Sequence, residues 1–225
     1  MMNDNLSNLL NSNPLRMELQ NHSLFSRLKE GGYEMDDVAY MLGQWWHPLH
    51  YFPTFLANCI ATLPTIESKC AITKILNQEV GDGEPRRSHE SIYISTMTKA
   101  GFDIKDVTQM AGSKETVALL KGFKESSFNK ADALGFIFAT EVVDLALVSS
   151  IGIGVEKVTG KKRLPWVEIH LIQEPDHVEE ADNSLMSVVD ADEFEQVSAS
   201  ADNAWRLWID FFDQIEQTMF ASAAA

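Results

Sequence analysis

The feature that most constrains the fold is a long apolar stretch, residues 133–155, that carries carboxylates near its middle. Glu141 and Asp144 interrupt this stretch, and Gly152 and Gly154 stand near its end. A span across a membrane would expose these charges to lipid, so we expect a buried helix at 129–149 that runs into a loop. The segment SIGIGVEKVTGKKRLP is then expected to be that loop, with a short extended piece.

Glu141 needs a partner in this apolar helix, because a buried and unpaired carboxylate costs several kcal/mol or becomes protonated. Two explanations stay open from this residue alone. The carboxylate can bind a hydrogen-bond donor in the core or face water on a narrow edge, or it can ligate a metal ion. Asp144 lies near the same face three residues later and is the reserve candidate for the same role.

The rest of the chain is dominated by helical periodicity, and the alternation typical of strands is nearly absent. This pattern predicts an all-α bundle of about seven to nine helices in a single domain over residues 14–219, with flexible tails at 1–13 and 220–225. The expected helices cover approximately 35–62, 65–80, 85–101, 103–111, 113–124, 129–149, 165–186 and 191–219.

The charge balance and the cysteines limit the classes of function. The sequence has 33 acidic and 18 basic residues, a formal charge of −15, which argues against a nucleic-acid partner because phosphate contacts need clustered cations. Cys59 and Cys70 give no disulfide framework, and no signal segment is visible at the N-terminus. We therefore expect a cytoplasmic protein with no membrane partner.

Two further groups of side chains have the chemistry of metal ligands. Glu79 ends one predicted helix and His89 begins the next, in NQEVGDGEPRRSHESIY, although both are also common surface choices. His170, Glu174 and His177 lie at i, i+4 and i+7, within an arc of roughly 60° on one helical face. Taken alone, this second group is either a ligand set or the solvated face of an acidic helix.

Together with Glu141 the two groups supply three carboxylates and three imidazoles, the composition expected for two iron or manganese ions in a helical bundle. A set without cysteine disfavours structural zinc, and the spacing of the histidines is a poor fit to a zinc protease. The paired Glu-x-x-His motifs of ferritin-type sites are absent.

These motifs resemble the haem-oxygenase-like diiron oxidases and oxygenases, which belong to the superfamily of the TenA thiaminases and the PqqC oxidase. The likeness spans about residues 20–215. YMLGQWWHPLHYFPTFLANCIATLP resembles the long first helix of the family, and NQEVGDGEPRRSHESIY resembles its Glu-x-Gly-x-Gly stretch followed by a ligand histidine. Glu141 matches the lone glutamate of the central helix, and His170-x3-Glu174-x2-His177 resembles the His-x3-Asp-x2-His motif of the family.

The resemblance implies a haem-oxygenase-like fold and a diiron enzyme that uses O2 as co-substrate to oxidise, desaturate or cleave a small organic substrate. The implied ligands of the two irons (manganese being the alternative metal) are Glu79, His89, Glu141, His170, Glu174 and His177. Glu174 stands where an aspartate is usual, and Pro175 beside it removes a backbone donor of the helix. Homodimers are common on this fold.

Three hypotheses follow from the sequence. The first is a non-haem diiron oxidase. The second is a metal-free binding or biosynthetic protein on the TenA/PqqC-like fold, in which the same six residues form a hydrogen-bonded polar core around a small ligand. The third is a helical interaction protein whose acidic face is only solvated. The cysteine nucleophile of TenA has no match, since neither Cys59 nor Cys70 lies in a corresponding segment. His47 and His50 are expected in the core and the pocket wall.

Overall fold

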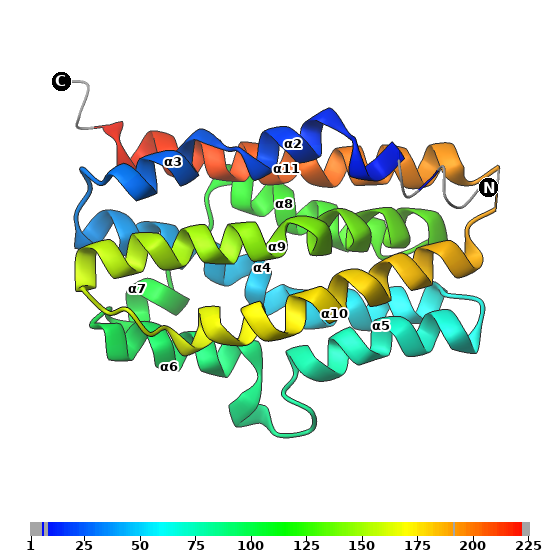
Figure 1. The fold of residues 1–225 in the computed structure, drawn as a ribbon, viewed down its shortest axis with the longest axis horizontal. Helices are drawn as coiled ribbons and strands as arrows, with labels where there is room; N and C mark the ends of the chain where they lie inside the picture. Colours follow the sequence, from blue (N-terminus) through cyan, green and yellow to red (C-terminus); the bar gives the residue numbers. More distant parts are fainter. Residues whose placement is uncertain (1–5, 7–8, 191, 222–225) are drawn as a thin grey trace.

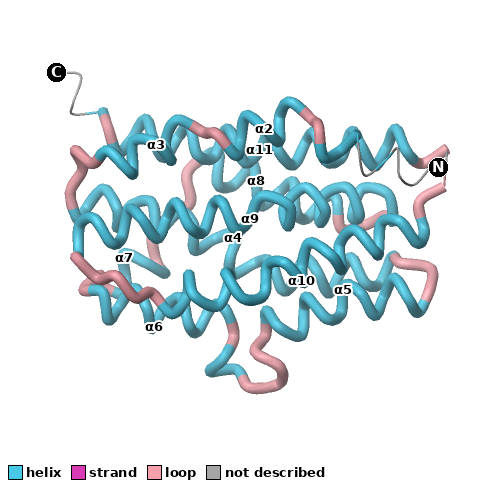
Figure 2. Tube along the Cα trace, in the orientation of Figure 1, coloured by secondary structure: helices cyan, strands magenta, loops and turns pink. Residues whose placement is uncertain are grey.

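The computed structural model describes residue 6, residues 9–190 and residues 192–221, and within these residues it contains helices and no strands (Figure 2). The predicted all-α class is confirmed. Ten α-helices and a short 3-10 helix (η1) are present in the described part (Figure 1): α2 Pro14–Gln20, α3 Ser23–Glu30, α4 Met35–Thr62, α5 Ile66–Glu79, η1 Pro85–Arg87, α6 His89–Ala100, α7 Ile104–Thr108, α8 Lys114–Ser126, α9 Lys130–Thr159, α10 Pro165–Val188 and α11 Phe194–Met219. The count exceeds seven to nine because the segment before residue 31 forms two helices, α2 and α3.

The α9 helix is the centre of the bundle. It packs against α11, α10, α4 and α3, and Figure 1 shows it running between α11 and α10. By length and composition α9 could cross a membrane, but 72% of its most apolar window is buried inside the protein. Its apolar side chains therefore form the core of the bundle, as expected for a buried helix.

The C-terminal half of α9 corrects one prediction. The segment expected to be a loop with a short extended piece is helical to Thr159, and the chain turns only at Gly160, which has φ +68°. Gly152 and Gly154 lie inside the helix because neighbouring elements approach them closely. A Cβ at Gly152 would lie 2.8 Å from Val167 Cγ2, and a Cβ at Gly154 would lie 3.1 Å from Leu28 Cδ2. Tertiary packing thus outweighs the weak helix propensity of these glycines.

The proposed tails lie partly outside the described residues. In the segment 1–13, the side chains of Leu6 and Leu10 are buried against the core, with 3% and 0% of their surface exposed. At the other end Phe220 is buried and contacts the core, and residues 222–225 are outside the described part.

The two prolines of the long first helix are accommodated without ending it. Pro48 and Pro53 lie inside α4, which is continuous over 28 residues. Trp45 on this helix is buried and packs against Trp166 of α10 and Trp208 of α11. An aromatic cluster at this point joins the three helices beside the polar site described next.

Candidate metal centre

The structure brings the six predicted residues together from four helices. Glu79 is the last residue of α5 and His89 is the first of α6, while α9 contributes Glu141. The α10 helix contributes three, His170, Glu174 and His177, on one face. All six side chains are buried, with at most 5% of their residue surface exposed.

A tight turn places Glu79 next to His89 although ten positions separate them. Gly81 and Gly83 have φ of +83° and +84°, and Asp82 between them has φ +54°. A Cβ at Gly81 would lie 2.4 Å from the carbonyl oxygen of Glu84, so only glycine fits this position. The sequence VGDGEP therefore reverses the chain, and His89 Nδ1 comes to 2.9 Å from Glu79 Oε1.

His177 lies at the middle of the cluster. Its Nδ1 atom is 3.4 Å from Glu141 Oε2, 3.5 Å from Glu174 Oε1 and 4.0 Å from Glu79 Oε1. Two donors that lie at right angles around one ion, each about 2.1 Å from it, are separated by about 3 Å. The separations of 3.4 and 3.5 Å from Glu141 and Glu174 lie near this value, so these donor atoms are spaced as ligands that can share an ion, while Glu79 lies farther from His177.

Each of the three histidines has one ring nitrogen held by a fixed partner outside the cluster. His89 Nε2 donates to Gln173 Oε1 (2.6 Å), and His177 Nε2 donates to Gln78 Oε1 (2.8 Å). His170 Nδ1 donates to the carbonyl oxygen of Trp166 (2.7 Å). Because amide and carbonyl oxygens only accept, the neutral imidazoles carry their lone pairs on the opposite nitrogen, the one that faces the carboxylates.

Several buried polar atoms of the cluster have no hydrogen-bond partner. They are the carboxylate oxygens Glu141 Oε1 and Glu174 Oε2. The ring atoms His89 Nδ1 and His177 Nδ1 also make no well-aligned hydrogen bond, although they lie 2.9 Å from Glu79 and 3.4 Å from Glu141. Buried polar groups are almost always satisfied in proteins, and ligand atoms of Glu141, Glu174 and His177 lie within 4.8 Å of one another, so a shared cation would satisfy this group. The residues present therefore fit a bound cation.

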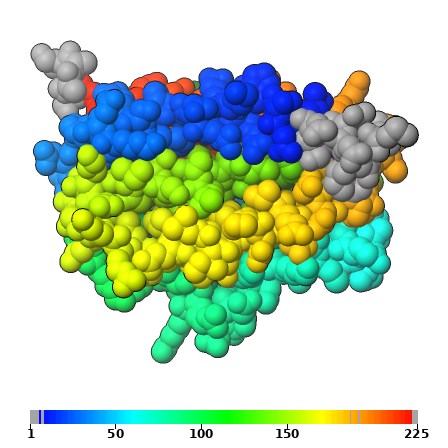
Figure 3. Space-filling view, viewed as in Figure 1, coloured from blue at the N-terminus to red at the C-terminus, as the bar shows by residue number. Residues whose placement is uncertain are grey.

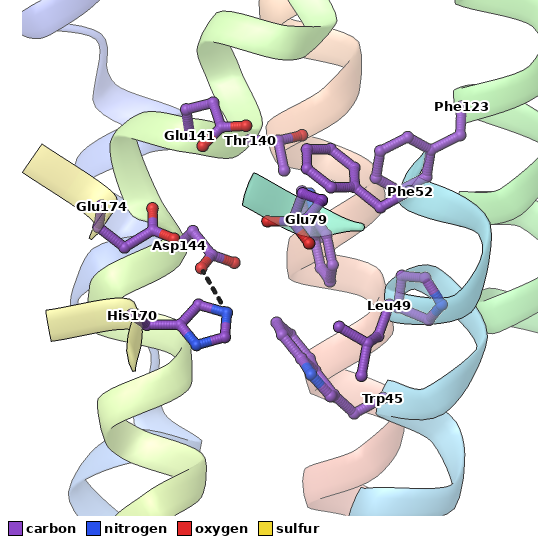
Figure 4. A pocket seen from close by; sticks show the side chains of 12 residues that line it. Trp45, Leu49, Phe52, Glu79, Phe123, Thr140, Glu141, Asp144, His170 and Glu174 are labelled. Atoms are coloured by element: carbon purple, nitrogen blue, oxygen red, sulfur yellow. Dashed lines mark ion pairs between the residues drawn. The ribbon is translucent and has the colours of Figure 1, made fainter. Parts of the chain in front are cut away.

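Asp144 joins the cluster as a fourth carboxylate, as the reserve candidate from the sequence. Its Oδ2 atom lies 3.9 Å from His170 Nε2, and Figure 4 shows the two side chains facing each other. Ligand atoms of Asp144, His170 and Glu174 lie within 4.8 Å of one another, and so do those of Glu141, Glu174 and His177. Glu174 belongs to both triads, which gives the centre two adjoining positions for a cation.

The pKa values of the cluster show that its buried carboxylates are stabilised by positive charge. Burial, with the nearby carboxylates Glu174 and Glu79, raises the pKa of Glu141 to about 7. Burial and then Glu174 also raise the pKa of Asp144. Burial disfavours the charged form of His177, but the attraction of Glu141 overrides it and raises this pKa to about 11. Four carboxylate charges would be balanced by two divalent cations.

The other two histidines are neutral or paired. Burial and the neighbouring His89 lower the pKa of His170 to about 4, so its ring is neutral at pH 7 and available as a ligand. Burial opposes the charge on His89, but Glu79 raises its pKa.

A small cavity of about 30 Å³ adjoins the centre on the side of α4. Figure 4 shows Glu141, Asp144, Glu174 and His170 on one side, with apolar side chains of α4 and α8 opposite. The apolar wall of the cavity consists of Trp45, Pro48, Leu49, Phe52, Phe123 and Trp208. This wall keeps water from the inner face of the centre.

The structure also places His47, His50 and Pro175, which the sequence singled out. The expectation that His47 and His50 lie in the core and the pocket wall was wrong, because His47 is half-buried, with Nε2 2.9 Å from the Met110 carbonyl oxygen, and His50 is exposed and pairs with Glu90. Neither lines the small cavity beside α4. The α10 helix continues through Pro175, and Glu174 and His177 on either side of it both face the centre. Gln78 and Gln173 were not predicted. Each directly precedes a predicted ligand, but their partners lie on another helix.

A family model described as iron-containing redox enzyme matches residues 39–209. The chain belongs to this family. The matched range contains every residue of the cluster, and it confirms the predicted resemblance. Membership of the iron-containing redox enzyme family indicates an oxidoreductase, in agreement with a donor set of imidazoles and carboxylates.

Solved structures show the fold that the chain shares. A CadD-like protein of unknown function from Nostoc punctiforme aligns with a TM-score of 0.80 at 15% identity, over 97% of this chain and 96% of that one. A TenA homologue from Pseudomonas syringae aligns with a TM-score of 0.75 at 15% identity, over 95% and 92%. A domain of unknown function with a haem oxygenase-like fold, from Shewanella denitrificans, gives 0.69 at 17% identity, over 100% and 93%.

These identities establish the haem-oxygenase-like fold and nothing finer. No match was found among curated proteins. The reaction of this member of the iron-containing redox enzyme family must therefore be argued from its own residues.

Proposed function

We propose that the chain is a non-haem diiron oxidoreductase that uses O2 to oxidise, desaturate or cleave a small organic substrate. Two iron ions, or manganese ions in their place, would be held by Glu79, His89, Glu141, His170, Glu174 and His177, with Asp144 as a further ligand. The observation that carries the proposal is the arrangement of the three imidazoles. Each is fixed through its outer nitrogen, and its inner nitrogen faces carboxylates at the same centre.

The chain's own residues have three roles in this proposal. Gln78, Gln173 and the Trp166 carbonyl fix the ring orientations before metal arrives, which lowers the cost of assembling the centre. The carboxylates neutralise the cations inside an apolar bundle. The wall of Trp45, Phe52 and Trp208 excludes water, so reactive species are not lost to solvent. Bound ferrous ions would supply electrons and open positions for O2.

The metal-free alternative, a hydrogen-bonded polar core around a small ligand, has less support. Such a core would satisfy its buried polar atoms, whereas the carboxylate oxygens Glu141 Oε1 and Glu174 Oε2 have no partner among the described residues. Cys59 and Cys70 are both free thiols, which fits the proposed reducing, cytoplasmic setting of a ferrous enzyme.

The proposal is tested by loading the protein with Fe(II) under anaerobic conditions and measuring O2 uptake after rapid mixing. The wild-type protein is expected to consume O2 faster than the same concentration of free Fe(II). The isosteric variant Glu141→Gln is expected to lose this excess. Glu156→Ala, a change at an exposed position of the same helix, serves as the control and should retain it. Uptake no faster than that of free iron, in wild-type protein that is fully folded by circular dichroism, would reject the proposal.

A further inference from the structure

Three cavities border the candidate metal centre from different directions, and they differ in size and lining. One of about 300 Å³ between α5 and α10 reaches His177, but its lining is mostly charged and includes Lys74, Asp176, Glu179 and Glu180. The inner cavity beside α4 has a volume of about 30 Å³, room for about two water molecules. A groove between α2, α9 and α10 has a volume of about 460 Å³, within the usual range for small-molecule sites. Glu141 and Glu174 line both the inner cavity and the groove, so the groove borders the outer side of the centre and has the room for an organic substrate.

The groove lies on the face shown in Figure 3, where α2, α9 and α10 are adjacent bands. Its apolar lining comes from α9 and α10 and consists of Val142, Leu145, Ala146, Pro175 and Val178. Its polar lining includes Arg16 and Gln20 from α2 and Ser149 from α9, besides the two glutamates. Arg16 is the one cationic side chain among the described residues that line it.

The position of α2 is fixed by local contacts. Asn13 caps the helix by accepting from the Leu15 backbone N–H (2.9 Å), and its side-chain amide donates to Asp202 of α11 (2.6 Å). Pro14 occupies the first turn, where its missing donor costs nothing. These contacts hold Arg16 on the side of α2 that faces α9.

The Arg16 guanidinium has no carboxylate partner among the described residues. Its Nη1 atom donates to Asn11, and Nη2 lies at a long 3.5 Å from the Val142 carbonyl oxygen, while Nε is buried without a partner. Burial lowers the pKa of Arg16, and no anion offsets this effect. Arg86 also has no acidic partner among the described residues, but it is exposed, whereas Arg16 is half-buried beside the groove.

We propose that this groove binds the substrate and that Arg16 holds the carboxylate of an amphipathic monocarboxylic acid. The guanidinium fork matches a carboxylate in geometry and charge. The apolar body of the ligand lies along Leu145, Ala146 and Val178, and the groove leads it to Glu141 and Glu174. A doubly charged phosphate is disfavoured by these two glutamates at the end of the groove. The assignment of the ligand as substrate rests on the proposed oxidase function.

Octanoate is the probe, and the uncharged octanamide of the same length is its matched control. Binding is measured by isothermal titration calorimetry on Mn(II)-loaded and on metal-free protein, with the metal content determined in parallel. Octanoate is expected to bind at least about tenfold more tightly than octanamide. Arg16→Gln is expected to lose at least about tenfold in octanoate affinity with unchanged metal content, while Arg163→Gln, the same change at a highly exposed site, has no effect.

Ala146→Leu provides a second variant, because it fills the groove and keeps the Arg16 guanidinium. It should weaken octanoate and octanamide alike and leave the metal content unchanged. Equal octanoate affinity in the wild-type and Arg16→Gln proteins, or octanamide binding as tightly as octanoate, would overturn the assignment of Arg16. Protein that binds octanoate through Arg16 but takes up no metal would refute the diiron proposal and leave the groove as an anion site. Protein that binds metal but not octanoate would refute the assignment of the groove and leave the diiron proposal standing.

Discussion

The glutamine partners of the histidines offer a sharp test of the centre, because they can be changed without removing any proposed ligand. His89 Nε2 donates to Gln173 Oε1 at 2.6 Å, and this bond keeps Nδ1 turned toward Glu79. In Gln173→Leu the buried N–H loses its acceptor, at a cost of about 1–3 kcal/mol. Losing an outer partner of a ligand histidine typically weakens metal binding by about 10–100-fold, which corresponds to about 1.4–2.7 kcal/mol. The free-energy cost of the lost acceptor therefore covers the range expected for the loss of metal affinity.

The affinity is best measured with Mn(II), whose unbound form is quantified by electron paramagnetic resonance during a titration. Gln173→Leu is expected to raise the dissociation constant by about 10–100-fold, whereas Gln173→Glu keeps an acceptor and should stay near the wild-type value. Gln217→Leu, the same change at an exposed position of α11, controls for the loss of an amide. A Leu variant within about twofold of wild type, which is about 0.4 kcal/mol, or a Glu variant as weak as the Leu variant, would refute the reasoning.

Three further predictions follow from the same structure. Glu141 raises the pKa of His177 to about 11, so metal must displace a proton from this ring at pH 7–9. The Mn(II) affinity should therefore rise about tenfold per pH unit in this range. An affinity independent of pH would contradict this. Asp144→Asn should lower the number of bound Mn(II) ions from two toward one in equilibrium dialysis, with the exposed Asp176→Asn as control, and two ions retained would exclude Asp144 as a ligand. Gly135→Ala should lower the free energy of unfolding by about 1–3 kcal/mol in urea titrations, because its Cβ would lie 2.3 Å from the Val197 backbone oxygen. Gly122→Ala meets side chains and no backbone, Leu207 Cδ1 at 2.3 Å and the Phe136 ring at 3.3 Å, and should cost less because the Leu207 side chain can move. Equal costs would contradict the packing argument.

Much of the fold followed from periodicity and from helix-ending residues. The expected helix at 35–62 has the bounds of α4, and the VGDGEP breaker ends α5 where its glycines predict. The prediction for α9 was wrong beyond residue 149 because Gly152 and Gly154 resemble helix breakers in the local sequence. Their place in a helix depends on Val167, Leu28 and Met41 of other elements, which no local pattern contains.

The candidate site, too, could be predicted from the sequence only in part. Glu141 was predicted because a carboxylate in an apolar helix requires a partner, and the three α10 residues were predicted from their spacing; the structure brings these residues together. Gln78, Gln173 and Arg16 were not found, because their roles depend on how α5, α10 and α2 are rotated against their neighbours. Polar residues at half-buried positions are common on any helix, so only the tertiary arrangement distinguishes these three.

The number of metal ions bound per chain tests the central claim most directly. Purified protein is equilibrated anaerobically with Fe(II), dialysed, and measured for iron and protein content, alongside a His177→Ala variant checked for folding by circular dichroism. The account predicts two ions per chain in the wild type, because Glu174 joins two adjoining triads of donors, and fewer in the variant. A folded wild-type protein that retains no iron, or one that retains the same amount as the His177→Ala variant, would contradict it.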